Sequence, residues 1–221
     1  MKKLPKVIYV MGPPGSGKGT QAKLLAEKIG YEQFSTGDAF RAIARLQTPL
    51  GKKVKETIDN GYLASPAMAA EIVVAAVKEH VEADQGIIFD GTPRTEEEAE
   101  IVDTFFTEQE YGRPLAIFLA VSKEEMEERN SKRKFCLGIA GDFPVTNEAE
   151  RSKCEKLGGT VGVRPDDEPA KYTTRWSEFT NRTKPVIDGY RQQGMLHDVD
   201  GMPEIEEVHE SVMAVINRYD T

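Results

Sequence analysis

Short apolar blocks and longer amphipathic segments alternate along the chain. The blocks are rich in β-branched residues, are typical of buried strands, and lie at residues 6–11, 86–90, 114–121 and, more weakly, 195–199. Each is followed by a charged segment with helical spacing of its apolar residues, as Leu24, Leu25 and Ile29 show after the first block. This alternation of strand and helix predicts an α/β fold built on a parallel sheet.

Two segments interrupt the alternation. Residues 35–64 have a helical pattern that contains glycines, and residues 134–167 are rich in glycine, proline and charge. Both break the strand–helix rhythm without adding a clear strand. We therefore expect both to be insertions that extend over the edge of the sheet.

Length and charge narrow the class of protein. The 221 residues suffice for one domain with insertions but hardly for two large domains. The chain has 29 Lys plus Arg against 37 Asp plus Glu, a formal charge of -8, which disfavours binding to nucleic acid or to an anionic membrane. Its apolar stretches are too short to span a membrane, and it starts without a signal-like apolar block. We expect a soluble, cytoplasmic protein.

A glycine-rich loop joins the first predicted strand to the first predicted helix. Its sequence is Gly12-Pro-Pro-Gly-Ser-Gly-Lys-Gly-Thr20. Glycines let consecutive backbone N–H groups point at a phosphate chain, the helix N-terminus adds partial positive charge, and Lys18 is placed to reach the outer phosphates. Because strand, glycine spacing, lysine and helix agree, we interpret residues 12–20 as a phosphate-binding loop.

The expected magnesium site departs from the general pattern. Most phosphate loops have Ser or Thr directly after the lysine, where its hydroxyl binds Mg²⁺, but here that residue is Gly19. Thr20 follows one position late, which rotates its hydroxyl by about a quarter turn of helix. We therefore expect Mg²⁺ to be held mainly through nucleotide oxygens and water, near Thr20 and Asp90. Asp90 ends a predicted strand, where a carboxylate can orient the waters of the ion.

Further motifs follow the loop in a fixed order. They are Phe34-Ser-Thr-Gly-Asp-Ala-Phe-Arg41, Ile58-Asp-Asn-Gly-Tyr-Leu63, Asp90-Gly-Thr-Pro-Arg94, Arg164-Pro-Asp-Asp167 with Arg175 beyond it, and Val199-Asp-Gly201. In these motifs and in the Gly-Lys-Gly-Thr form of its loop, the chain resembles the adenylate kinase branch of the nucleoside monophosphate kinases over nearly its whole length. The resemblance implies a P-loop kinase three-layer sandwich with a five-stranded parallel sheet. It also implies a CORE domain (1–34, 65–132 and 168–221), an acceptor-binding NMP segment (35–64) and a LID segment (133–167).

The resemblance implies roles for individual residues. Donor ATP is expected to contact Gly12, Pro13, Gly15, Ser16, Gly17, Lys18, Gly19, Thr20, Arg129, Arg133, Gly201 and Pro203. Acceptor AMP is expected to contact Thr36, Gly37, Arg41, Ile58, Tyr62, Ala64, Gly91, Arg94, Glu98, Arg164 and Arg175. The expected catalytic residues are Lys18, Asp90, Arg94, Arg133, Arg164 and Arg175, and the expected hinge of the LID segment holds Asp166 and Asp167. Arginine suits this chemistry because its planar guanidinium grips phosphate oxygens in pairs and offsets the charge that develops during transfer.

Three positions bear on the choice of acceptor base. Thr36 matches the residue that accompanies adenine in the family, which favours AMP. However, Thr92 stands where the family usually has Phe, and Glu98 stands where adenylate kinases commonly have a Gln that pairs with adenine. An ionised carboxylate only accepts hydrogen bonds, whereas a guanine edge offers two donors. Either acceptor choice is looser than usual, or Glu98 points away and backbone groups read the base.

The LID segment has half of a zinc site. Many family lids hold the metal with two pairs of ligands, but Cys136 and Cys154 each lack a partner, since Ile139 and Leu157 stand at the matching positions. Structural zinc needs four ligands, so we expect no zinc and a small apolar LID core around Ile139 and Leu157. In a reducing cytosol we also expect no disulfide between the two cysteines.

The leading interpretation is an adenylate kinase. It would be a monomer that transfers the terminal phosphate of Mg-ATP reversibly to AMP, with nucleotides as its partners. One alternative is a kinase of the same fold that acts on GMP, UMP or CMP. Another is a nucleotide-dependent assembly factor, although such a factor would not need Arg41, Arg94 and the LID arginines in register.

Overall fold

The computed structural model describes residues 2–82, 85–139 and 141–220 and contains a central sheet of five parallel strands. The strands stand in the order β3-β4-β2-β5-β9 and comprise Glu32–Ser35, Ile87–Asp90, Val7–Met11, Leu115–Ala120 and Leu196–Asp200. The predicted α/β fold with a five-stranded parallel sheet is confirmed. Four of the strands coincide with the apolar blocks of the sequence, whereas β3 has only one strongly apolar residue, Phe34.

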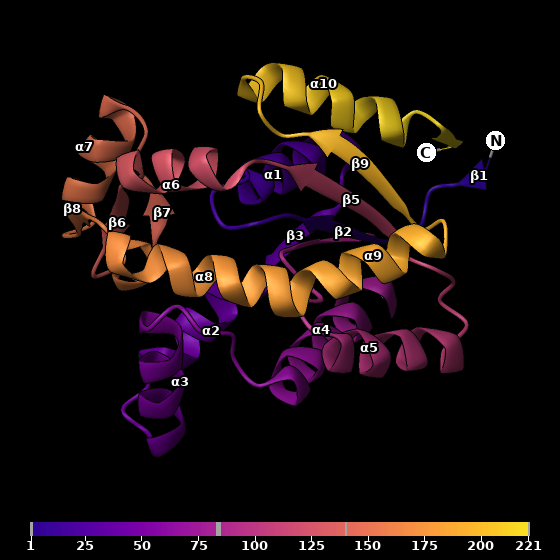
Figure 1. The fold of residues 1–221 in the computed structure, drawn as a ribbon, viewed down its shortest axis with the longest axis horizontal. Coiled ribbons are helices and arrows are strands. Elements are labelled where there is room, and N and C mark those ends of the chain that lie inside the picture. The colour runs from indigo at the N-terminus through magenta and orange to yellow at the C-terminus, as the bar shows by residue number, and fades with distance from the viewer. Residues whose placement is uncertain (1, 83–84, 140, 221) are drawn as a thin grey trace.

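Two layers of helices cover the sheet (Figure 1). The first is formed by α1 (Lys18–Ile29) and α10 (Ile205–Ile216), and the second by α4 (Pro66–Glu82), α5 (Glu96–Glu108) and α9 (Lys184–Gln192). Strand β2 is apolar on both faces because each face of the sheet is covered by a layer of helices. Ile8 and Val10 pack into the core with α1 and α10, while Tyr9 and its odd-numbered neighbours pack into the core with α4 and α5. The expected three-layer sandwich is therefore present.

The order of the strands places a binding crevice at one edge of the sheet. From β2 the chain passes to β3 and β4 on one side and then crosses to β5 and β9 on the other. In parallel sheets, ligands bind beyond the carboxyl ends of the strands where the order reverses. The loop after β2 and the end of β4, Asp90, both lie at this point.

The segments expected as insertions have their own small structures (Figure 1). Residues 35–64 form α2 (Thr36–Ala44) and α3 (Pro49–Asp59). Residues 133–167 form an antiparallel sheet of β6 (Phe135–Leu137), β7 (Phe143–Pro144) and β8 (Thr160–Gly162), with α7 (Glu148–Lys156) between β7 and β8. Helix α6 (Lys123–Lys132) leads into this sheet, and a short 3-10 turn (Pro165–Asp167) leads out of it.

One long helical element connects the LID end of the molecule to the CORE (Figure 1). A 3-10 turn at Pro169–Lys171 is followed by α8 (Tyr172–Glu178), a π-helical segment at Phe179–Thr183 and α9. The remaining strands, β1 (Lys2–Lys3) and β10 (Tyr219–Asp220), pair with each other close to the two termini. Within the described residues, no helix is both long and apolar enough to cross a membrane.

The LID core differs from the expectation. Cys136 and Cys154 form a disulfide, which contradicts the prediction of two free thiols. The turn of the LID chain brings β6 and α7 together and places the two Cα atoms 5.5 Å apart, within the range that a disulfide spans. The expected role of Leu157 is also wrong, because this side chain is 54% exposed, while Ile139 is half-buried near the sulfur atoms. The prediction of free cysteines depended only on the reducing cytosol, and it could not account for the folding that brings Cys136 and Cys154 together.

Candidate active site

The phosphate-binding loop forms a tight turn between β2 and α1. Gly15 and Gly17 have φ angles of 77° and 83°, in the left-handed region that other residues rarely adopt. A Cβ atom on Gly12 would lie 2.5 Å from Ser16 Oγ and 2.9 Å from the carbonyl of Leu119, so only glycine fits there. The loop therefore presents main-chain groups rather than side chains at the N-terminus of α1, as the sequence predicts.

Lys18 lies at the first residue of α1 and in the wall of the central pocket. Its Nζ atom donates to the carbonyl of Pro13 over 3.4 Å. Burial lowers the pKa of Lys18 to about 8, and the nearby Asp90 carboxylate opposes this shift while Arg94 adds to it. A bound polyphosphate would favour the charged form of Lys18, which is the form that binds phosphate.

Asp90 explains the glycine that follows Lys18. A Cβ atom on Gly19 would lie 3.0 Å from Asp90 Oδ2, so a larger residue would displace either the helix or the carboxylate. The other oxygen, Asp90 Oδ1, is buried and has no hydrogen-bond partner among the described residues. A buried carboxylate oxygen without a donor suits a hydrated cation, so these residues fit Mg²⁺ held through water. Thr20 is exposed on the same first turn of α1.

Asp167 holds two of the predicted catalytic arginines. Arg133 donates to both carboxylate oxygens of Asp167, over 2.6 and 2.7 Å from Nη2, and Arg175 donates to Oδ1. Asp167 is fully buried. Burial alone would raise the pKa of Asp167, but the charges of Arg133 and Arg175 lower it overall. Arg175 also donates to the carbonyl of Asp166 over 3.1 Å. Both expected hinge aspartates therefore contact arginines.

Arg164 belongs to the LID segment and lies beside Asp38 of the NMP segment. Its guanidinium carbon is 3.4 Å from the centroid of the Phe135 ring, and its nitrogens lie 3.7 Å from Asp38 and 3.8 Å from Asp142. Burial lowers the pKa of Arg164 to about 10, and the charge of Arg41 acts in the same direction. Arg164 therefore stays positively charged at neutral pH. It does not belong to the lining of the central pocket, although it was expected to contact AMP.

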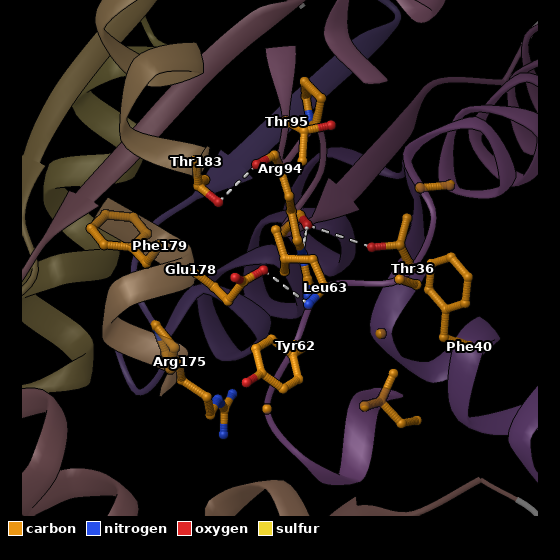
Figure 2. A pocket seen from close by; sticks show the side chains of 18 of the residues that line it. Thr36, Phe40, Tyr62, Leu63, Arg94, Thr95, Arg175, Glu178, Phe179 and Thr183 are labelled. Carbon is orange, nitrogen blue, oxygen red and sulfur yellow. Dashed lines mark hydrogen bonds between the residues drawn. The ribbon is translucent and has the colours of Figure 1, made fainter. Parts of the chain in front are cut away.

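The central pocket brings most of the predicted acceptor residues together (Figure 2). These residues come from α2, from α3 and the loop after it, from the loop after β4, from the start of α5 and from α8. They are Thr36, Gly37, Arg41, Ile58, Tyr62, Ala64, Gly91, Arg94, Glu98 and Arg175. Gly12 and Lys18 extend the same pocket to the phosphate-binding loop. Thr36 is buried and lies 3.5 Å from the carbonyl oxygen of Gly91, its hydrogen-bond acceptor. The pocket thus joins the two predicted nucleotide sites.

Arg94 is fixed from several directions. Its Nε donates to the carbonyl of Gly91, its main-chain N–H donates to Glu98 over 2.8 Å, and its main-chain carbonyl accepts from Thr183 over 2.9 Å. Burial lowers the pKa of Arg94, whereas the Asp90 and Glu98 carboxylates oppose this shift. Figure 2 shows the hydrogen bond between Thr183 and Arg94.

Sequence reasoning missed several residues of the pocket. Glu178 accepts from the main-chain N–H of Leu63 over 3.2 Å and so joins α8 to the end of the NMP segment (Figure 2). Phe40 and Phe179 form apolar parts of the wall. A polar residue on a helical segment gives no signal of a contact with a loop 115 residues away, so only the fold reveals Glu178.

The remaining donor residues lie beside the phosphate-binding loop. Arg129 of α6 donates to the carbonyl of Met202 over 3.0 Å, which brings it next to Gly201 and Pro203. The main-chain N–H of Gly201 in turn donates to the carbonyl of Ala120 at the end of β5. Helix α6 also contacts the loop, because a Cβ atom on Gly15 would lie 3.1 Å from both Asn130 Oδ1 and the carbonyl of Met126. The residues predicted to bind ATP therefore cluster, while their individual roles stay predictions.

Among the described residues, no group of three or more His, Cys, Asp or Glu side chains could hold a metal ion. The two cysteines of the LID segment are joined to each other rather than placed as ligands.

The sheet, the phosphate-binding loop and the converging arginines define a P-loop phosphotransferase. Comparison with known proteins makes this more specific: the sequence model of the family described as adenylate kinase matches residues 10–195. The chain belongs to the adenylate kinase family. It is 37% identical over 216 residues to the adenylate kinase of Archaeoglobus fulgidus, which covers 96% of this chain and 98% of the relative. It is 36% identical to that of Clostridium perfringens strain 13 over 96% of this chain and 98% of the relative, and 35% identical to that of Carboxydothermus hydrogenoformans over 96% and 99%.

Proposed function

We propose that the enzyme transfers the terminal phosphate of Mg-ATP reversibly to AMP and forms two molecules of ADP. The observation that supports this most is the composition of the central pocket. Lys18 of the phosphate-binding loop shares that pocket with Arg41, Arg94 and Arg175, which come from three other parts of the chain. An enzyme that only hydrolysed its nucleotide would not need cations on the acceptor side.

The residues act mainly by positioning and by charge. Transfer between two nucleotides brings two polyanions together, and the moving phosphoryl group spreads negative charge over its oxygens. We assign the donor phosphates to the loop and Lys18, and the acceptor phosphate to Arg41 and Arg94. Arg133 and Arg175, which share Asp167, are assigned to the transferring group, with Arg164 closing over it from the LID side. When bound, Mg²⁺ would neutralise donor oxygens, with its waters oriented by Asp90 and Thr20.

Closure of two mobile parts would exclude water from the reaction. We assign the NMP segment to residues 35–64 and the LID segment to residues 133–167, with the rest of the chain as the CORE. Exclusion of water both strengthens the attraction between arginines and phosphates and prevents hydrolysis of ATP. Action as a cytoplasmic monomer stays a prediction from the sequence.

The choice of acceptor is the part of the proposal that most needs a test. Purified protein is mixed with Mg-ATP and either AMP, GMP, UMP, CMP or no acceptor, and diphosphate formation is followed by chromatography. We expect rapid ADP formation with AMP. A preference for GMP or a pyrimidine nucleotide would leave the fold and mechanism intact but change the acceptor, and phosphate release without regard to the acceptor would overturn the proposal.

A further inference from the structure

Two residues that depart from the family pattern contact each other in the structure. Thr92 stands where the family usually has Phe, and Glu98 where adenylate kinases commonly have Gln. The hydroxyl of Thr92 donates to Glu98 Oε1, and both side chains are nearly inaccessible to solvent, with exposed fractions of 1% and 2%. The two departures therefore form one structural unit.

The second oxygen of Glu98 is bound to the residue that we assign to the acceptor phosphate. Glu98 Oε2 accepts from the main-chain N–H of Arg94 over 2.8 Å. Glu98 is the third residue of α5, and its own N–H donates to the capping side chain of Thr95 over 3.1 Å, so the start of the helix fixes its place. Each carboxylate oxygen thus accepts from the protein itself, one from Thr92 and the other from Arg94.

A carboxylate buried in this way requires such donors. Burial raises the pKa of Glu98, because it disfavours the charged form, while the hydrogen bonds from Thr92 and Arg94 oppose this shift. Loss of one donor leaves a buried carboxylate oxygen with less compensation, and the carboxylate then moves or takes up a proton. If the carboxylate moves, the main-chain N–H of Arg94 loses its acceptor. If it takes up a proton, that N–H is left with a neutral and therefore weaker acceptor. On the opposite side, Thr183 holds the carbonyl of the same residue.

We propose that Thr92 and Glu98 are positioning residues that act through the main chain of Arg94 to hold its guanidinium for the acceptor phosphate, and that Glu98 does not select the acceptor base. The proposal rests on the proposed function, since it assumes that Arg94 binds the phosphate of AMP. If the proposal holds, the affinity for AMP depends on the hydroxyl of Thr92 as much as on the carboxylate of Glu98. A base-reading Glu98 would act through its remaining lone pairs and would make the hydroxyl of Thr92 secondary.

The experiment compares Thr92→Val with Thr92→Ser and Glu98→Gln. Val has nearly the shape of Thr but lacks the hydroxyl, whereas Ser retains it. We expect Thr92→Val to raise KM for AMP by about tenfold, because a hydrogen bond to a charged group is lost, with KM for ATP within about twofold of the wild type. Thr92→Ser is expected to restore KM for AMP. A general loss of folding would affect both substrates and would not be restored selectively.

Base selectivity supplies the second measurement. Gln at position 98 can still accept from Arg94 and can donate to the oxygen of Thr92, so we expect Glu98→Gln to keep the ratio of kcat/KM for AMP over GMP within about threefold of the wild type. A change of that ratio by about tenfold or more in Glu98→Gln, with Thr92→Val unchanged in KM for AMP, would overturn the proposal and make Glu98 a base-reading residue.

Equilibrium titration of AMP in the absence of ATP separates this proposal from the proposed function. If the wild-type protein binds AMP but forms no ADP, the function fails while the comparison of the three variants still decides the role of Thr92 and Glu98. If Thr92→Val binds AMP as tightly as the wild type, the positioning role is wrong even in an active enzyme. Thermal melting of each variant checks that it is folded.

Discussion

Arg45 and Asp142 form an ion pair between the NMP and LID segments, with 2.6 Å between Arg45 Nη2 and Asp142 Oδ1. Arg45 caps the C-terminal end of α2, and Asp142 lies directly before β7, 97 residues further along the chain. Arg164 lies 3.8 Å from the same carboxylate. The pair requires the two segments to lie close together, so it favours the closed arrangement that we propose.

We expect Arg45→Gln to raise KM for both AMP and ATP by about two- to fivefold, since a partly exposed ion pair contributes roughly 0.2–1 kcal/mol. Steady-state kinetics provide the measurement. The value of kcat should not fall, because an enzyme whose product release limits turnover gains from easier opening. Arg45→Lys, which keeps the charge, is the matched control. Its KM values should lie between those of the wild type and those of Arg45→Gln. A fall in kcat with unchanged KM values would show that the pair supports chemistry rather than closure.

The pKa of Lys18 predicts that nucleotide binding takes up a proton. With a pKa lowered from 10.5 to about 8 by burial, Lys18 is largely neutral in the free protein above that pH, and triphosphate binding would return it to the charged form. Calorimetric titration with a non-hydrolysable ATP analogue, in two buffers of different ionisation enthalpy, counts the protons. We expect uptake close to one proton at about pH 9 and close to none at about pH 6.5. Equal uptake at both pH values would contradict this interpretation.

The same shift affects stability in a defined pH window. Between the folded-state pKa of about 8 and the ordinary value of 10.5, the unfolded chain binds more protons at Lys18 than the folded chain does. The contribution of this group to the free energy of unfolding therefore rises with pH across that window. Lys18→Met removes the titrating group, so it should abolish both the extra proton uptake and this part of the pH dependence.

The sequence was sufficient to predict those parts of the fold and site that depend on neighbouring residues only. The loop at residues 12–20 could be predicted with its strand and helix, because glycine, lysine and apolar periodicity each depend on nearby residues only. Strand β3 could not be identified from its own composition, since Glu32 and Gln33 are as common in loops and only pairing with β4 makes the segment a strand. Likewise, the hydrogen bond between Thr92 and Glu98 could not be predicted, because it depends on the path of the loop between β4 and α5. Residue types alone left open whether Glu98 reads the acceptor base or points away from it.

The disulfide between Cys136 and Cys154 predicts a redox-dependent LID. Both residues are buried, and the bond connects β6 to α7 across 18 residues of sequence. Closing a loop of about this size stabilises a folded segment by roughly 3 kcal/mol in the chain-entropy description. We expect a reductant to lower the thermal midpoint and to increase hydrogen exchange in β6, α7 and β8, while the sheet of the CORE keeps its protection. The variant with both cysteines changed to Ala should not respond to reductant. Unchanged exchange in the LID after complete reduction would show that the bond adds no stability there.

Two helical glycines should respond in opposite ways to the same substitution. At Gly19, an added Cβ would lie 3.0 Å from Asp90 Oδ2, whereas at Gly189 in α9 no described atom beyond its own helix lies within 4 Å of an added Cβ. Neither has the positive φ angle that glycine alone favours. Alanine normally stabilises a helix interior relative to glycine by roughly 0.5–1 kcal/mol, so Gly189→Ala should raise the thermal midpoint and leave turnover unchanged.

At Gly19 the same gain is opposed by crowding of the carboxylate. We expect Gly19→Ala to lower kcat by about tenfold or more, because displacement of Asp90 by even a fraction of an ångström changes how it can orient waters beside the donor phosphates. Magnesium titration of turnover is the specific measurement, and it should show that Gly19→Ala needs more Mg²⁺ for half-maximal rate than Gly189→Ala does. If Gly19→Ala keeps full activity and the same magnesium dependence, then Asp90 either yields to the methyl group or takes no part in holding the ion. In either case, the glycine after Lys18 would not be explained by Asp90. Asp90→Asn then decides between the two, because unchanged magnesium dependence in that variant would overturn the assignment of Asp90 to catalysis.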